Sequence, residues 1–327
     1  MNVSVVICAY TMDRWDDLVA AVRSCADQRL KPHEIVVVID YNDELVTRAQ
    51  LELTDARVVA NRSTRGLSGA RNSGVVVSTG DVIAFLDDDA FAESDWLEHL
   101  VAPLQDPHVA GTGGWIVPNW DGDIARWLPE TFYWVIGCSY LGLPADRSTI
   151  RNPIGASMAL RRSVFSSVGG FTSGIGRVGL IPLGCEETEL CIRYISLHPS
   201  ERFELARNAI VHHRVPRSRL TWHYFWTRCW AEGLSKAAVT SLAGAGSGLS
   251  SERHYVVHAL PQEFLRSARS LRKEPRANGT RIALLIAGSV ITVAGLLRGR
   301  IALRRTPLSV GVGDLDAFMT GHAEEEG

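Results

Sequence analysis

Apolar residues in the first 110 positions fall into short runs that alternate with segments of helical spacing. The predicted strands are residues 3–9, 34–40, 57–60 and 81–86. Helices are predicted after the first strand and over residues 68–78, which Gly80 closes. Strands that are apolar throughout and alternate with helices indicate an α/β fold, with a doubly wound, mostly parallel sheet covered by helices on both faces. Ligands of such sheets bind beyond the carboxyl ends of the strands.

The pattern changes after position 110. Residues 111–215 are irregular and rich in glycine, tryptophan and proline, whereas residues 220–242 are predicted to be helical. Serine and glycine dominate residues 241–251, a composition typical of a flexible connector. We therefore expect a ligand-binding half in residues 1–110, a second half in 111–240, a C-terminal helical extension in 241–305 and a disordered tail in 306–327.

Composition and charge narrow the class of protein. The chain has 327 residues, of which 46% are hydrophobic and 21% charged, and its net charge is −2. These values are typical of a globular protein and argue against a nucleic-acid-binding one. The six cysteines form no C-x-x-C pair and no zinc-type spacing with histidine, and no leader pattern precedes the first strand. We therefore expect reduced thiols and a cytoplasmic location.

Three consecutive acids, Asp87, Asp88 and Asp89, directly follow the strand predicted at 81–86. Side chains alternate along a strand, so Asp87 and Asp89 point to the same side. Two carboxylates there suit Mg²⁺ or Mn²⁺, which bind few protein ligands and favour the oxygens of a diphosphate. The alternative is that the three acids cap the next helix or face solvent, although their mutual repulsion at the end of an internal strand favours a cation.

A second acidic cluster, Glu186 and Glu187, opens a predicted helix that continues through Tyr194. Acidic residues in a first helical turn are stabilised by the helix dipole, so a purely structural role is the alternative to catalysis. The glycine-rich segment 174–184 that precedes them is predicted to be a mobile loop that gates an acceptor site.

These segments together resemble the family 2 glycosyltransferases, which have the GT-A fold. The resemblance covers residues 1 to about 235 and rests on the order and spacing of several segments rather than on one motif. The matching segments are VSVVICAY, VVVID, NRSTRGLSGARNSGVVVSTGDVIAFLDDDA, GASMALRRSVFSSVGGF and GCEETELCIRY.

The resemblance implies a role for individual residues. Residues 1–110 would bind a nucleotide sugar, and residues 111–240 would bind the acceptor and catalyse transfer. Metal ligation falls to Asp87 and Asp89, and His213, which follows a strand-like segment, is a further candidate. Contacts with the nucleotide sugar fall to Ala9, Tyr10, Asp40, Arg65, Gly66, Arg71, Asn72, Asp87 and Asp88.

The implied reaction is a single inverting displacement that depends on Mn²⁺ or Mg²⁺. Glu187 would remove the proton from an acceptor hydroxyl, the oxygen would attack the anomeric carbon, and the nucleoside diphosphate, UDP or dTDP, would leave. The family often has aspartate at the position of Glu187, and the extra methylene shifts the carboxylate, so Glu186 is the alternative base. The acceptor would be a cell-envelope glycan, a lipid-linked saccharide or a small molecule.

Residues 282–297 form an apolar stretch of 16 residues bounded by arginines. At about 1.5 Å per residue a helix of this length reaches about 24 Å, which is short of a bilayer core of about 30 Å. The arginines suit anionic headgroups, so residues 281–305 are predicted to contact the inner face of the cell membrane. The alternative is a helix hairpin packed on the catalytic domain, with its glycines at close contacts.

Two other classes of protein are alternatives to a glycosyltransferase. A nicotinamide dehydrogenase requires a glycine-rich turn after the first strand, but residues 9–13 read AYTMD, which excludes it. A non-catalytic, membrane-associated scaffold or nucleotide-sugar-binding relative is a second alternative, and the C-terminal segment alone favours the scaffold.

Overall fold

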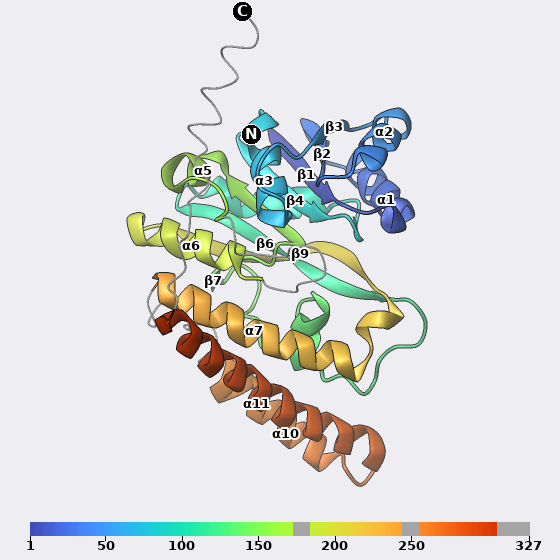
Figure 1. Ribbon diagram of the computed structural model, residues 1–327, viewed down its shortest axis with the longest axis vertical. Coiled ribbons are helices and arrows are strands. Elements are labelled where there is room, and N and C mark those ends of the chain that lie inside the picture. Colours follow the sequence, from blue (N-terminus) through green and yellow to red (C-terminus); the bar gives the residue numbers. More distant parts are fainter. Residues whose placement is uncertain (173–183, 244–254, 306–327) are drawn as a thin grey trace, which may run out of the picture.

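The computed structural model describes residues 1–172, 184–243 and 255–305, and Figure 1 shows their arrangement. One sheet runs through residues 3–215, and the helices α7 (Trp222–Ala243), α10 (Leu260–Arg269) and α11 (Pro275–Arg305) at the C-terminal end lie below it in this view. The first half of the chain contributes β1 (Val3–Ala9), α1 (Trp15–Ala26), β2 (Glu34–Ile39), α2 (Asp43–Glu52), β3 (Arg57–Ala60), α3 (Leu67–Val77), β4 (Val82–Asp87), β5 (Ala90–Ala92), α4 (Trp96–Val101) and β6 (Val109–Trp120).

The parallel part of the sheet comes from the N-terminal half, as the sequence predicts. Strands β3, β2, β1 and β4 lie side by side in that order and pair with one another in parallel. The carboxyl ends of β1, β2 and β4 therefore meet at one edge, which brings Ala9, Asp40 and Asp87 to the same region.

The second half extends this sheet with antiparallel and parallel pairings, so the complete sheet is mixed. Strand β8 pairs antiparallel with β4 and β6, whereas β9 pairs parallel with β6 and antiparallel with β5 and β7. The remaining elements are β7 (Thr149–Ile150), β8 (Ser157–Arg161), α5 (Arg162–Val168), α6 (Glu186–Leu197) and β9 (Arg202–Val215).

Alternating side chains of the central strands form two hydrophobic cores, one on each face of the sheet. In β1, Val5 and Ile7 belong to the core that includes α1, α2 and α4, whereas Val6 belongs to the core that includes α3, α5 and α6. This period of two, in strands that are apolar throughout, confirms the prediction of a sheet covered on both faces.

The short strand β5 positions the end of the acidic run. Its pairing with β9 sets Ala90 opposite His213, and the backbone N–H of Arg214 donates to the carbonyl of Asp89 at 2.8 Å. Strand register therefore brings residues that are far apart in sequence to one point.

The C-terminal helices form a layer built around the contact between α7 and α11. Helix α11 lies along α7 (Figure 1), and its glycines permit close approach: a Cβ at Gly295 would lie 2.5 Å from the carbonyl oxygen of Trp230, and one at Gly299 would lie 2.6 Å from the Cβ of Ala237. These contacts agree with the prediction of a hairpin whose glycines mark close packing.

The helix that contains the apolar segment is longer than the segment itself, so its reach exceeds the predicted value of about 24 Å. Helix α11 spans 31 residues rather than the 16 of the apolar core, because its flanking residues are helical too. By length and composition it is long enough to cross a membrane, and 28% of its most apolar window is buried in the protein. Length alone therefore does not exclude a spanning helix. Three predicted segments lie wholly or mostly outside the described residues: the gating loop at 174–184, the connector at 241–251 and the tail at 306–327.

Candidate active site

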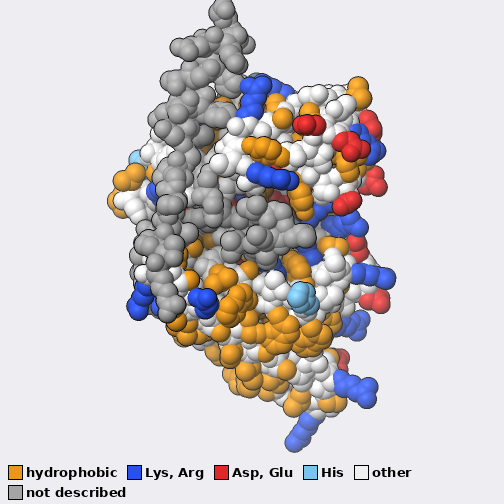
Figure 2. All heavy atoms as spheres, viewed as in Figure 1, with side chains coloured by type: hydrophobic (Ala, Val, Ile, Leu, Met, Phe, Trp, Pro, Cys, Tyr) orange, Lys and Arg blue, Asp and Glu red, His pale blue; other side chains and the backbone are white. Residues whose placement is uncertain are grey.

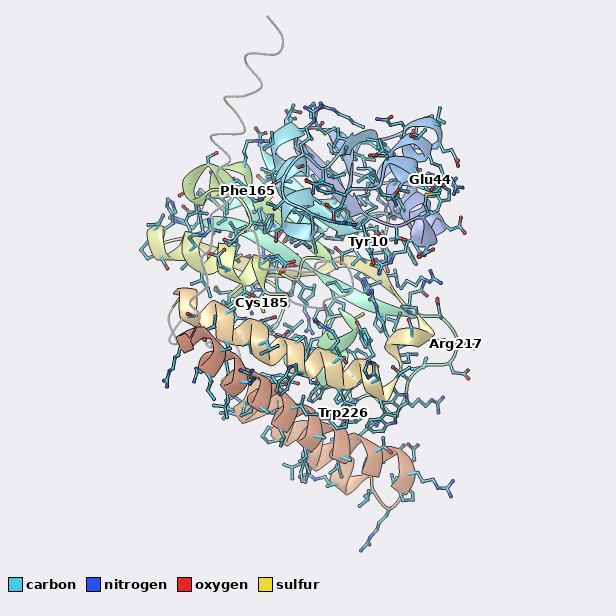
Figure 3. The ribbon with its side chains drawn as sticks, in the orientation of Figure 1. Tyr10, Glu44, Phe165, Cys185, Arg217 and Trp226 are labelled. Atoms are coloured by element: carbon cyan, nitrogen blue, oxygen red, sulfur yellow. The ribbon has the colours of Figure 1, made fainter. Side chains whose placement is uncertain are left out.

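A cavity of about 300 Å³ lies where the N-terminal half meets α6 and α7. Tyr10, which follows β1, and Cys185, which precedes α6, both face this region, whereas Glu44 lies at the periphery (Figure 3). The residues that the sequence singled out and that line the cavity are Ala9, Tyr10, Asp40, Arg65, Gly66, Arg71, Asp87, Asp88, Asp89, Glu186, Glu187 and His213.

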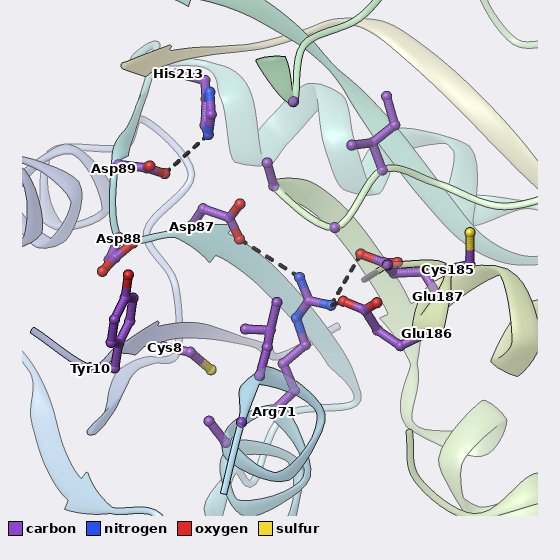
Figure 4. Close-up of a pocket in the computed structure, with 18 of the residues that line it drawn as sticks. Cys8, Tyr10, Arg71, Asp87, Asp88, Asp89, Cys185, Glu186, Glu187 and His213 are labelled. Atoms are coloured by element: carbon purple, nitrogen blue, oxygen red, sulfur yellow. Dashed lines mark hydrogen bonds and ion pairs between the residues drawn. The ribbon is translucent and has the colours of Figure 1, made fainter. Parts of the chain in front are cut away.

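Asp87, Asp89 and His213 form a group suited to a metal ion. Their ligand atoms all lie within 4.8 Å of one another, and Asp89 Oδ1 is 3.1 Å from His213 Nε2 (Figure 4). Ligand atoms around Mn²⁺ or Mg²⁺ lie about 3 to 4 Å apart, given metal–oxygen distances of about 2.1 Å, so small rotations suffice for binding. The two carboxylates suit a hard divalent cation, and the imidazole of His213 offers a nitrogen ligand.

Asp89 is buried and paired with two arginines as well as with His213. Arg219 Nη2 lies 2.9 Å from Asp89 Oδ2, and Arg14 Nη1 lies 3.2 Å from the same oxygen. Burial opposes ionisation of Asp89, but His213, Arg219 and Arg14 outweigh burial and hold its pKa well below the usual range. Asp89 is therefore an anion that already has cationic partners, which a bound metal would have to share or displace.

Asp88 shares Arg14 with Asp89 but is not part of the group formed by Asp87, Asp89 and His213. Arg14 Nη1 is 2.8 Å from Asp88 Oδ1, and the carboxyl is 4% exposed. Burial, followed by the negative charge of Asp89, raises the pKa of Asp88 despite the contact with Arg14. Asp88 thus helps to place Arg14 beside the cavity.

Arg71 connects the acidic run with the two glutamates of α6. Its guanidinium lies 3.0 Å from Glu186 Oε1, 3.1 Å from Glu187 Oε1 and 3.7 Å from Asp87 Oδ1 (Figure 4). Burial opposes the charge of Arg71, but Glu187, Glu186 and Asp87 raise its pKa above the ordinary value. A Cβ at Gly155 would overlap Glu187 and Arg71, so the absence of a side chain there leaves room for the contact.

The two glutamates differ in their access to the cavity. The side chain of Glu187 is 14% exposed, whereas that of Glu186 is 4% exposed. Both open α6, where the helix dipole favours negative charge, so the structural role weighed above applies to both. Glu187 is therefore the more accessible of the two carboxylates to a bound hydroxyl.

Asp40 is fixed at the end of β2 by two hydrogen bonds. Asn61 Nδ2 donates to its Oδ1 at 2.6 Å and the backbone N–H of Gly66 donates to its Oδ2 at 3.0 Å. Gly66 has φ +116°, a conformation that favours glycine, and it caps the start of α3. On the other side of this part of the cavity, Tyr10 is 36% exposed, and the guanidinium of Arg14 lies 5.6 Å from its ring centre.

Asn72 does not join the cavity, although nucleotide contact was predicted for it. Its amide group donates to the carbonyl of Phe171 at 2.9 Å and accepts from the N–H of Phe171 at 2.8 Å. Asn72 is 3% exposed and fastens α3 to the chain that follows α5. Its position therefore does not support contact with a ligand in this cavity.

Sequence reasoning missed two cationic residues, Arg14 and Arg219. Arg14 follows β1 and Arg219 follows β9, so each comes after the carboxyl end of a strand, as Asp40 does. The rule that indicated Asp40 also applies to them. The pairing of β5 with β9, which brings Arg219 near Asp89, was not predicted.

Comparison with known proteins identifies the family of the chain. A model of glycosyl transferase family 2 matches residues 4–169. The chain is 35% identical over 246 residues to the glucosyl-dolichyl phosphate glucuronosyltransferase of Haloferax volcanii, a match that covers 74% of this chain and 78% of the relative. It is 26% identical over 271 residues to the succinoglycan biosynthesis protein ExoM of Rhizobium meliloti, covering 76% of this chain and 82% of the relative.

The fold is also similar to that of a solved enzyme. The mannosyltransferase PcManGT from Pyrobaculum calidifontis, in complex with GDP-Man and Mn²⁺, aligns with a TM-score of 0.50 and 16% identity over 98% of this chain and 79% of that one. This likeness concerns the fold alone, and with the mixed, mostly parallel sheet it confirms the predicted GT-A type. The chain is a glycosyltransferase and belongs to glycosyl transferase family 2.

Proposed function

We propose that this enzyme transfers a sugar from a nucleoside diphosphate sugar to an acceptor hydroxyl with inversion at the anomeric carbon. One observation carries the proposal: a single cavity brings the Asp87, Asp89 and His213 group together with Glu187. Asp87, Asp89 and His213 suit a metal ion that binds the diphosphate, and Glu187 suits the role of proton acceptor. An inverting displacement requires both.

Asp87, Asp89 and His213 would hold Mn²⁺ or Mg²⁺. A bound divalent cation would neutralise the charge that develops on the departing diphosphate. Arg219 and Arg14 lie beside this group and are within reach of the same phosphates as charge-assisted donors. PcManGT, which has a similar fold, was solved with GDP-Man and Mn²⁺, and this supports the proposal of a nucleotide sugar bound together with a metal ion.

Glu187 would act as the general base, and Arg71 would hold its carboxylate in place. Arg71 Nη1 lies 3.1 Å from Glu187 Oε1, which fixes the direction in which the carboxylate points. Glu186, which shares Arg71, remains the alternative base. The step balances because the acceptor proton passes to the carboxylate while the electron pair of the anomeric bond leaves with the nucleoside diphosphate.

The nucleoside would lie along the ends of β1 and β2. Tyr10 offers an exposed ring, and Asp40 is held rigidly where its carboxylate can receive a base N–H or ribose hydroxyl. Arg65 and Gly66 line the same side of the cavity. We propose UDP or dTDP as the leaving group.

The proposed acceptor is a lipid-linked saccharide at the cytoplasmic face of the membrane. The Haloferax volcanii relative is named for a dolichyl phosphate substrate, and the match covers 78% of its length. We assign donor binding to residues 1–110, acceptor binding and catalysis to 111–240, and membrane contact to the helical extension at 241–305.

A thermal-shift titration tests the donor site. UDP, dTDP and GDP, with and without Mn²⁺, are added to the wild-type protein and to Asp87→Asn and Asp89→Ala variants, with Asp55→Asn as a control at an exposed carboxylate outside the cavity. We expect one nucleotide to stabilise the wild type only with Mn²⁺, by about 2.7 kcal/mol at 100 times its Kd. The two cavity variants should lose this gain, whereas the control should keep it.

Two results would contradict the proposal. Stabilisation by a nucleotide that is equal with and without Mn²⁺ would remove the metal from donor binding. Retention of the metal-dependent gain in both cavity variants would move the metal site elsewhere. Metal-dependent binding without any sugar transfer to a range of acceptors would instead favour the non-catalytic relative weighed above.

A further inference from the structure

An apolar strip runs along the outer side of α11. Its members recur at intervals of three or four residues, so they share one face of the helix, and each is about half exposed or more. The strip consists of Ile286 (55%), Val290 (61%), Val293 (54%), Leu297 (53%) and Ile301 (49%).

Helix α7, which packs along α11, adds exposed aromatic rings. Trp222 is 51% exposed, Trp226 37% and Trp230 40%, and their spacing of four places them on one side of α7. Figure 2 shows hydrophobic side chains gathered over the lower part of the molecule, where these helices lie. An exposed apolar area of this extent marks a surface that is covered in use.

The charges around the strip identify what covers it. Helix α11 contains six arginines and no acidic residue, although the whole chain has a net charge of −2. Arg298, Arg300 and Arg304 are exposed at its C-terminal end, and Arg272 and Lys273 are exposed just before its start. An apolar face bounded by cations at both ends, with tryptophans beside it, matches the surface of an anionic bilayer.

Packing decides how α11 meets the membrane. The carbonyl of Trp230 and the Cα of Gly233 lie against Gly295, so α7 accompanies α11 over much of its length. Helix α7 also carries Glu232 and Lys236, which form an ion pair at 2.7 Å. A spanning α11 would draw these charges toward the hydrocarbon, which is costly. A helix lying in the plane of the headgroups would not.

We propose that the strip on α11 and the three tryptophans of α7 form a monotopic docking surface that lies in the interfacial plane of an anionic bilayer. This surface fixes the orientation of the active site, because Tyr224, Arg228 and Glu232 of the same α7 line the cavity. Helix α7 therefore contacts the cavity directly, and α11 packs along it and carries the apolar strip on its outer side. The inference rests on the proposed function in one respect: the docked orientation would bring a membrane-held acceptor to the active site.

Flotation of the full chain with lipid vesicles tests the docking surface. We expect binding to vesicles of phosphatidylcholine with phosphatidylglycerol, and at least ten-fold weaker binding in the triple variant Ile286→Ser, Val290→Ser, Val293→Ser. A matched control, Leu51→Ser with Leu197→Ser, removes two exposed apolar side chains elsewhere (75% and 62% exposed) and should bind as the wild type does.

A second variant tests the charges. Arg298→Gln, Arg300→Gln, Arg304→Gln should weaken binding by about five-fold per arginine at low salt and by much less at high salt. Arg29→Gln, at a side chain that is 68% exposed on the N-terminal half, is its control. Equal binding to vesicles of phosphatidylcholine alone would contradict the role of the arginines.

Three outcomes would overturn the proposal. The first is that the protein floats with neither kind of vesicle. The second is resistance to alkaline carbonate extraction, which would indicate a spanning helix. The third is a dimer in solution that the triple serine substitution dissociates, which would assign the face to a second copy of the chain. The metal-dependent thermal shift of the serine variant separates the two hypotheses. If the serine variant keeps the metal-dependent shift but no longer floats, the substitutions have removed membrane docking and left donor binding intact. If the wild type itself shows no metal-dependent shift, the proposed function fails, whatever the flotation result.

Discussion

Arg71 joins carboxylates from the two halves of the catalytic part. It lies on α3, and its partners lie at the end of β4 and at the start of α6. Its side chain is 3% exposed, and the close acids offset the cost of burying its positive charge. The pairing of Asp87 with Arg71 means that a cation which draws Asp87 toward Asp89 would also alter the environment of Glu187.

The general base can be tested by one substitution. Glu187→Gln keeps the shape of the side chain but cannot accept a proton, so turnover should fall by about 100-fold or more while the metal-dependent nucleotide shift stays within error. Steady-state assays with a labelled donor measure the first quantity and thermal shift the second.

A parallel substitution identifies the base. Glu186→Gln should lower turnover less than Glu187→Gln does, because Glu186 is less accessible to the cavity. The reverse order would assign the base to Glu186. Glu44→Gln, at an exposed carboxylate outside the cavity, controls for unspecific effects.

Residue types at strand ends were predictable, whereas their partners were not. Asp40, Asp87 and Asp89 were found because they follow apolar runs. Arg14 and Arg219 were missed because arginines are common on surfaces and only tertiary pairing distinguishes these two. Asn72 was placed at the ligand by resemblance, but its hydrogen bonds hold the chain near Phe171.

Among the elements, the contact between α7 and α11 depends on the absence of side chains. A Cβ at Gly233 would overlap the carbonyl oxygen of Thr292, and Gly295 has an equivalent restriction from α7. Helix α11 offers an internal comparison, because a Cβ at Gly279 would meet no atom within 4 Å.

Alanine at these two glycines should therefore have opposite effects. Gly295→Ala should lower the free energy of unfolding by about 1 to 3 kcal/mol, because the helices must separate. Gly279→Ala should raise it by about 0.5 to 1 kcal/mol, because alanine favours a helix. Urea unfolding measures both, and destabilisation of equal size in the two variants would show that the close contact does not govern the effect.

The four parallel strands of the N-terminal half were predictable to within about one residue because each is an uninterrupted apolar run, whereas the short strand β5 was not predicted. The predicted strand at 81–86 is Val82–Asp87, and the predicted helix at 68–78 is Leu67–Val77. In the second half, β9 spans 14 residues that include several charged side chains, so its pattern did not indicate a long strand. Helix α11 was underestimated because arginines at its ends ended the apolar run but not the helix.

At the scale of the whole molecule, the cysteines form no disulfide, and most of them lie away from solvent. All six are free, and four of them are buried. Burial raises the pKa of Cys25 and of Cys229 to about 12. The folded state therefore binds protons that the unfolded chain has already released at alkaline pH.

Stability should consequently fall as the pH rises. A thiol whose pKa is raised on folding stabilises the folded state fully below the unfolded value of about 8.5 and loses this contribution toward 12. We expect a loss of roughly 1.4 kcal/mol for each such thiol and each pH unit above about 8.5. Urea unfolding at pH 8, 9 and 10 measures the slope, and Cys25→Ala should reduce it. Rapid alkylation of Cys25 in the folded protein at pH 9 would contradict this account.

The pairing of β5 with β9 has a consequence for how such an enzyme can diversify. The register of these two strands brings Asp89 close to His213, and the contact between their side chains at 3.1 Å completes the placement. Loops inserted between the intervening elements can therefore lengthen, shorten or change sequence without altering the spacing of these two side chains. New acceptor preferences can arise by remodelling those loops while the donor chemistry is inherited intact.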